Sequence, residues 1–353
     1  MRILYIDCWS PPGHFQFNKI HLKSLSQIGE VGVIFRENAF KILDIHNVHR
    51  VMELSDHYFE NHEGSLNIRL SMARMMRSIW NKINHKEWDY IILATYDPMA
   101  LFLSRKFKRA MVIDHNTIAD LDNPIKGFCL RHLGSNIKHI VFNENMMSKL
   151  LKSGVDNCAI VPHGFLPMND RKWSDEEIKN KKECYDIREG QNFIFIPSLS
   201  TGCEDLIGMY VYNTGFNDFL KENNLVLLTK SKTERTSMSN IRIIQGRIPQ
   251  ENYEFLFKHS ACNIMLYSST FKYRTSGVLN ECFANNVPCI MNNNSALLAY
   301  KGYINNEHFC FSNSEEMKES ILSVLHWDKS TSYYGNISEI ADPLESWKKI
   351  LSN

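Results

Sequence analysis

Short apolar runs alternate with amphipathic stretches throughout the first half of the chain. The apolar runs have the length of buried strands, and the amphipathic stretches repeat their apolar residues at helical spacing. The predicted strands are Met1–Asp7, Val31–Phe35, Tyr90–Ala94, Ala110–Asp114 and Ile137–Phe142, and the predicted helices are Phe15–Ile28, Leu66–Ile83 and Pro98–Phe107. This alternation predicts parallel strands joined by crossover helices, and such doubly wound sheets bind ligands beyond the carboxyl ends of their strands.

The same alternation starts again in the second half, after a polar and charged stretch in which Trp173–Lys182 predicts a solvated helix. The strands predicted further on are Phe193–Pro197, Leu225–Thr229, Ile241–Ile244, Cys262–Tyr267, Val287–Met291 and Phe309–Phe311, and the last two helices are Glu315–Leu325 and Pro343–Leu351. The sequence therefore predicts an α/β protein with two Rossmann-like, doubly wound parallel-sheet domains that face one another across a cleft.

The length of 353 residues agrees with this division, because one hydrophobic core rarely serves so long a chain. We expect an N-terminal Rossmann-like domain over residues 1–167, a linker over residues 168–191 and a C-terminal Rossmann-like domain over residues 192–335. Residues 336–353 are expected to form a C-terminal helix, with packing back onto the N-terminal domain as one option.

Charge and cysteine content exclude some classes of partner. Lys and Arg number 40 and Asp and Glu 39, so the net charge of +1 indicates no nucleic-acid partner. The nine cysteines form no C-x-x-C pair and are expected to be reduced thiols. The N-terminus lacks the features of a signal peptide, and no apolar run approaches the roughly 18 residues that cross a bilayer, which predicts a cytoplasmic protein.

The segment Tyr273–Met291 carries the sharpest local signal. Ser276 and Gly277 stand where the cap and first residue of a helix belong. Such a helix presents free backbone N–H groups and the positive end of its dipole, a natural seat for a diphosphate, and Gly277 has no Cβ to keep the phosphate away. Arg274 would add a charge-assisted contact, and Glu281 would accept hydrogen bonds from a ribose diol. The alternative is an ordinary capped helix with a surface glutamate.

Three segments together resemble GT-B glycosyltransferases of the group 1 retaining class, the type that builds bacterial surface polysaccharides. Ser276–Ile290 is similar to the family's nucleotide-sugar-binding stretch, in which Gly and a short apolar run precede Glu-Ala-Met-Ala-x-Gly-x-Pro-Val-Ile. Ile140–Phe165 is similar to the signature that ends the family's first domain, and Gly246–Tyr267 to its turn, helix and following strand. The segments occur in the family's order and span most of residues 137–300.

The resemblance implies roles for further residues. It assigns donor binding to Gly13, Gly246, Arg247, Tyr273, Thr275, Ser276, Gly277, Val278 and Glu281. The family's glutamate eight positions before Glu281 is Tyr273 here, which leaves the donor sugar open. The family's Arg and Lys after the first strand of the second domain are also missing, so Lys230 and Arg274 are the candidates that offset the phosphate charges. A solvated loop lysine is the alternative for Lys230.

Two further candidates follow the Ala110–Asp114 strand. A similar histidine in the family closes over the donor sugar, so the resemblance assigns His115 to a contact with a sugar hydroxyl. Asp114 is the competing candidate, as the general base that an inverting transfer requires. A structural histidine is the alternative for His115.

The implied function is transfer of a sugar from a nucleotide-diphosphate donor to a saccharide or lipid-linked saccharide acceptor with retention of configuration, without a cofactor or a metal. A non-catalytic nucleotide-sugar-binding subunit or sensor is the alternative, and an epimerase or phosphorylase is a rival within the enzymes. The basic stretch Arg105–Arg109 either attracts anionic lipid at the inner face of the cell membrane or is a solvated helix end.

Overall fold

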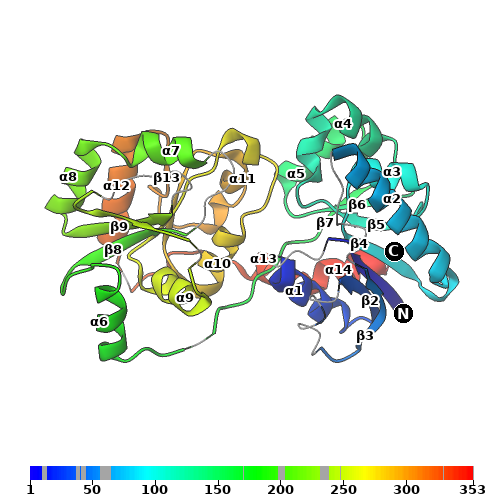
Figure 1. The fold of residues 1–353 in the computed structure, drawn as a ribbon, viewed down its shortest axis with the longest axis horizontal. Helices are drawn as coiled ribbons and strands as arrows, with labels where there is room; N and C mark the ends of the chain where they lie inside the picture. The colour runs from blue at the N-terminus through cyan, green and yellow to red at the C-terminus, as the bar shows by residue number, and fades with distance from the viewer. Residues whose placement is uncertain are drawn as a thin grey trace. The chain divides into compact units, whose positions relative to one another are not determined.

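The computed structural model describes residues 1–9, 14–36, 40, 45–55, 65–169, 171–197, 203–230, 238–246, 248–328 and 330–352. The chain divides into two compact units. The first unit comprises Met1–Phe165, Tyr273–Thr275 and Ser338–Asn353, and the second comprises Leu166–Lys272 and Ser276–Ile337. Each unit is built on its own sheet (Figure 1).

The first unit contains a seven-stranded sheet in the order β3-β2-β1-β4-β5-β6-β7, and all its neighbouring strands are parallel. The strands are β1 (Arg2–Asp7), β2 (Glu30–Arg36), β3 (Val48–Leu54), β4 (Tyr90–Thr95), β5 (Met111–Ile113), β6 (Lys138–Val141) and β7 (Cys158–Ile160). The order of strands reverses between β1 and β4, and ligands of open parallel sheets bind beside such a reversal, at the carboxyl ends of the strands.

Helices cover both faces of this sheet (Figure 1). Ile3 and Tyr5 of β1 belong to one core cluster, and Leu4 and Ile6 belong to the other, as the alternation of side chains along a strand requires. The first cluster takes side chains from α1 (Phe15–Leu25), α5 (Glu144–Lys152) and α14 (Leu344–Leu351), and the second from α2 (Ser65–Lys82) and α3 (Pro98–Ser104). Also in this unit are η4 (His85–Glu87), η5 (Thr117–Asp122), α4 (Pro124–Arg131) and α13 (Ser338–Ala341).

The last helix of the chain, α14, packs against α1 of this unit. Trp347 is fully buried, and its indole Nε1–H donates a 3.0 Å hydrogen bond to Nδ1 of His21. Because Nδ1 accepts, the neutral His21 ring carries its proton on Nε2, which donates to the carbonyl of His163 at 3.1 Å. The C-terminal helix is thereby tied to α1 of the first unit.

Replacing Trp347 with phenylalanine is expected to lower the free energy of unfolding of the first unit by about 1–3 kcal/mol. The variant keeps most of the buried ring but leaves Nδ1 of His21 without its donor. Urea denaturation checks this, with Trp327→Phe as the control, because the Trp327 indole donates to the carbonyl of Thr331 in an exposed setting of the second unit. Equal losses in the two variants would contradict the expectation.

The second unit contains a six-stranded parallel sheet in the order β10-β9-β8-β11-β12-β13. The strands are β8 (Asn192–Ile196), β9 (Leu225–Lys230), β10 (Ile241–Ile244), β11 (Asn263–Met265), β12 (Cys289–Asn292) and β13 (Cys310–Phe311). The helical segments are α6 (Asp175–Glu183), α7 (Cys203–Tyr210), α8 (Thr214–Glu222), α9 (Gln250–His259), η6 (Ser269–Phe271), α10 (Gly277–Asn285), α11 (Ser295–Leu298), η7 (Lys301–Tyr303) and α12 (Ser314–Leu325). In this sheet the order reverses between β8 and β11.

Two strands were not predicted from the sequence, β3 and β7, and both lie at edges of the first sheet. Their residues are mostly half-buried, so they carry neither the continuous apolar run of a central strand nor a clean alternation. Residues 168–191, expected to be a linker, fall within the second unit, where Trp173 and Ile178 pack against its core. In the described part of the chain, no helix is long and apolar enough to cross a membrane.

Candidate functional site

The helix α10 begins beyond β11, on one side of the reversal in the second sheet. Ser276 is its N-cap and is buried, and its Oγ accepts a 3.1 Å hydrogen bond from the amide of Leu279. In the described part of the chain, the amides of Gly277 and Val278 donate to no other group. A Cβ placed on Gly277 would meet nothing within 4 Å. The positive end of the helix therefore has two free amides, and Gly277, which carries the first of them, borders open space.

Side chains from two strands hold this helix end in place. The hydroxyl of Tyr267, just after β11, lies 2.7 Å from Oγ of Ser276. Asn292, at the end of β12, makes two hydrogen bonds to the backbone of Tyr267. Its Oδ1 accepts from the Tyr267 amide at 2.8 Å, and its Nδ2 donates to the Tyr267 carbonyl at 2.9 Å. Asn294 donates to the carbonyl of Ser268 at 2.9 Å. The start of α10 is thus fixed before any ligand arrives, as an anion site requires.

Glu281 lies on α10 with its carboxylate partly buried. Its Oε2 accepts a 2.6 Å hydrogen bond from the hydroxyl of Tyr253 on α9. Burial raises the pKa of Glu281 above its ordinary value, and the hydrogen bond from Tyr253 partly opposes that shift. Within the described residues, Oε1 of Glu281 accepts no hydrogen bond.

The other predicted donor-binding residues are distributed over both units. Lys230 ends β9 and pairs with Ile244 of β10, and Gly246 follows β10 with φ of 72°, a left-handed conformation that glycine adopts without strain. Tyr273, Arg274 and Thr275 belong to the first unit, where the ammonium of Lys149 lies 5.4 Å from the centre of the Tyr273 ring. Gly13 and Arg247 lie outside the described residues.

Asp114 is fully buried at the end of β5. Its carboxylate accepts hydrogen bonds from the hydroxyls of Tyr96 and Thr117, and Nδ1 of His139 lies 2.8 Å from its Oδ2. A general base needs at least one oxygen within reach of the substrate. The surroundings of Asp114 are instead those of a structural carboxylate, and they do not favour the base role weighed from the sequence.

His115, the next residue, lies among aromatic rings. Its ring centroid is 4.5 Å from that of His14, 4.2 Å from that of Phe17 and 4.9 Å from that of Phe142. Burial, followed by the charges that His14 and His163 would carry, holds the pKa of His115 well below its ordinary value, so the ring is neutral at pH 7. Its buried Nε2 has no hydrogen-bond partner among the described residues, so the ring keeps the capacity to bind a hydroxyl.

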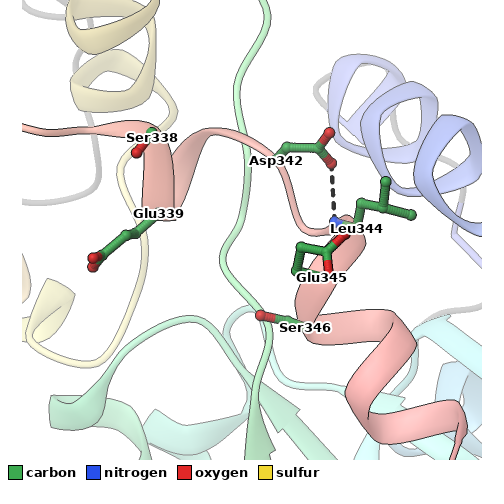
Figure 2. Close-up of a pocket in the computed structure, with 6 residues that line it drawn as sticks. All are labelled: Ser338, Glu339, Asp342, Leu344, Glu345 and Ser346. Carbon is green, nitrogen blue, oxygen red and sulfur yellow. Dashed lines mark hydrogen bonds between the residues drawn. The ribbon is translucent and has the colours of Figure 1, made fainter.

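Figure 2 shows a pocket of about 400 Å³ at the start of α14 in the first unit. The side chains of Glu339, Asp342 and Glu345 line it, and Oδ1 of Asp342 accepts from the amide of Leu344 at 2.9 Å and from Oγ of Ser24 at 2.9 Å. Three carboxylates would repel a diphosphate. This pocket is therefore not a candidate donor site.

No protein-family model matches the chain, and no curated protein sequence matches it. Solved structures match over its whole length. The trehalose-6-phosphate synthase OtsA is 11% identical with a TM-score of 0.66, covering 100% of this chain and 99% of its own. A glycosyltransferase from Rickettsia africae is 14% identical with a TM-score of 0.57, covering 100% and 93%. The UDP-GlcNAc 2-epimerase from Neisseria meningitidis bound to UDP-GlcNAc is 12% identical with a TM-score of 0.60, covering 100% of both chains.

At these identities the likeness shows the fold. The fold class predicted from the sequence, α/β with two Rossmann-like parallel-sheet domains of the GT-B type, is confirmed. Sequence reasoning missed Tyr253, Tyr267, Asn292 and Asn294, the residues that hold Glu281 and the start of α10. Tyr267, Asn292 and Asn294 have one signal in the sequence, since each is a polar residue at the end of a buried strand or just after one. Tyr253 has no such signal.

Proposed function

We propose that this chain is a glycosyltransferase that moves a sugar from a nucleoside-diphosphate donor to a saccharide or lipid-linked saccharide acceptor in the synthesis of a bacterial surface polysaccharide, with retention of configuration. The observation that carries the proposal is the start of α10, where two amides are free and Gly277 borders open space beside the reversal of the second sheet. The structural likeness to nucleotide-sugar enzymes supports it, since the epimerase was solved with UDP-GlcNAc bound.

In the proposed reaction, the bond between the anomeric carbon and the diphosphate oxygen breaks. The acceptor hydroxyl forms the new bond on the same face of the sugar, and its proton passes to the departing diphosphate. Amides at Gly277 and Val278 would stabilise the leaving charge, with Arg274 and Lys230 as the candidate cations. Glu281 would hold the ribose, and neutral His115 would bind a sugar hydroxyl. No cofactor or metal takes part in this scheme.

A panel of nucleotide sugars, with release of nucleoside diphosphate as the readout, tests the proposal. We expect slow hydrolysis of one donor in the absence of acceptor, because water can replace the acceptor hydroxyl. Conversion of the donor into a second nucleotide sugar would favour an epimerase instead. Binding of a donor without turnover, even with acceptors present, would favour a non-catalytic nucleotide-sugar-binding subunit.

We extend the proposal to a peripheral contact with anionic membrane, suited to a lipid-linked acceptor. In the first unit α3 packs against both α2 and α4 (Figure 1). These three helices and the stretch Arg105–Arg109 carry ten Lys and Arg and no Asp or Glu, and two of the ten, Arg69 and Lys126, pair with Asp97 and Asp120 of the adjoining segments. Ile125 and Phe128 of α4 are 63% and 49% exposed. Exposed apolar residues among cations are typical of surfaces that bind anionic bilayers.

Replacing Ile125 and Phe128 together with serine is expected to lower binding to vesicles of anionic lipid by at least about tenfold, because both side chains lose the apolar area they would bury. Co-sedimentation with phosphatidylglycerol vesicles measures this, with neutral vesicles as the reference. Met209→Ser is the matched control, since Met209 is 59% exposed in the second unit. Equal sedimentation of the two variants would contradict a membrane contact through α4.

A further inference from the structure

Tyr253 on α9 and Glu281 on α10 form a half-buried, hydrogen-bonded pair, and the proposed reaction assigns no role to Tyr253. We infer that Tyr253 is a positioning residue, which holds the Glu281 carboxylate ready for the ribose diol of a ribonucleoside-diphosphate donor. The inference rests on the proposed function and deepens it. It assigns to Tyr253 a role that no motif in the sequence indicated.

The geometry leaves the carboxylate one oxygen for the ligand. The hydroxyl of Tyr253 donates to Oε2 of Glu281 at 2.6 Å, and Oε1 accepts from no described residue. A carboxylate held at one oxygen keeps its rotamer and presents the other oxygen in a fixed direction. Glu281 is therefore oriented before a nucleotide binds.

Tyr253 is itself held by its surroundings. Its ring lies with its centroid 6.2 Å from that of Phe195 on β8 and 5.7 Å from that of Phe257 on α9. Phe195 and Phe257 are fully buried. Tyr253 thus connects Glu281 to β8, the strand on the other side of the reversal from β11. Glu281 is thus linked, through Tyr253, to one of the two strands that flank the reversal.

The hydroxyl also affects the charge of the carboxylate. Burial raises the pKa of Glu281, which favours the neutral acid, whereas the hydrogen bond from Tyr253 lowers it. Burial and the neighbouring carboxylate raise the pKa of Tyr253, so its hydroxyl keeps its proton and remains a donor. An ionised carboxylate is the stronger acceptor for a diol. Tyr253 therefore supports both the direction and the charge of Glu281.

The test measures binding affinity by calorimetry. It uses whichever of UDP, GDP and ADP binds most tightly, and compares that ribonucleotide with its own 2′,3′-dideoxy analogue. For Tyr253→Phe we expect about a tenfold loss of affinity for the ribonucleotide and no loss for the dideoxy analogue, which has no diol to bind. In a Glu281→Ala background, which has no side-chain acceptor for the Tyr253 hydroxyl, Tyr253→Phe should have no further effect. With donor and acceptor, the loss should fall on KM more than on kcat.

Tyr210→Phe is the matched control, because the Tyr210 hydroxyl donates to the carbonyl of Ser312 at 2.9 Å elsewhere in the same unit. Unchanged dideoxy affinity shows that Tyr253→Phe is folded. Equal ribonucleotide affinity in Tyr253→Phe and the wild type would overturn the inference and leave the proposed function standing. A wild type that binds dTDP but no ribonucleotide would have the same consequence. A wild type that binds no nucleoside diphosphate would overturn both.

Discussion

Gly277→Val is expected to lower the affinity for a nucleoside diphosphate by roughly 100-fold while changing the free energy of unfolding by less than about 1 kcal/mol. A side chain on Gly277 has open space around it, and Gly277 has no positive φ, so folding tolerates valine. That same space is where the diphosphate would approach the amides of Gly277 and Val278. Loss of two charge-assisted hydrogen bonds, about 1.5 kcal/mol each, gives the expected factor.

Gly302→Val provides the control for this substitution. Gly302 is also in the second unit and also has nothing within 4 Å of a Cβ, but it lies in η7. Thermal shift with a nucleoside diphosphate and calorimetry should show normal binding for Gly302→Val. If Gly277→Val binds as tightly as the wild type, no diphosphate sits at the start of α10, and the proposed function loses its main support.

The first unit is expected to lose about 4 kcal/mol of stability between pH 7 and pH 5 through two histidines. Burial lowers the pKa of His21 to about 3 and that of His163 to about 4, against about 6.5 in the unfolded chain. Below pH 6.5 both histidines are therefore mostly protonated in the unfolded chain, whereas in the folded unit they stay neutral until the pH approaches their lowered pKa. Their stabilising effect is complete above pH 6.5 and falls by about 1.4 kcal/mol per pH unit for each group as pH drops toward the folded pKa.

Neighbouring histidines should add to this loss. Burial also lowers the pKa of His14 and His115, although Asp7 partly opposes the shift of His14. Urea denaturation read by hydrogen exchange separates the two units and measures the slope with pH. His163→Asn should reduce the slope, because it removes one titrating group. The asparagine amide can replace the 2.9 Å hydrogen bond from Nδ1 to the carbonyl of Gly164, so the fold should be kept. His132→Asn is the control, because His132 is exposed and its Nδ1 bonds the Phe128 carbonyl, and it should leave the slope unchanged. Equal slopes in the two variants would contradict the expectation.

The sequence predicted the central strands of both sheets, because each is a short, continuous apolar run of the kind that a buried parallel strand requires. It also predicted the cap of α10, because Ser-Gly before a short apolar helix is a local signal, and Ser276 is that cap. It did not predict β3 and β7, whose half-buried residues depend on their place at the sheet edges. The cleft between the domains and the donor-binding roles remain predictions.

Local patterns therefore determined the central strands, their parallel order and the position of a free helix end, since these depend on residues close together in the sequence. Tertiary structure decided which side chains reach one another. It placed Tyr253 on Glu281 across 28 positions, gathered His14, His115 and His163 around Phe17, and enclosed Asp114 among Tyr96, Thr117 and His139. Such contacts depend on how separate elements pack, and no single segment of the sequence encodes that packing.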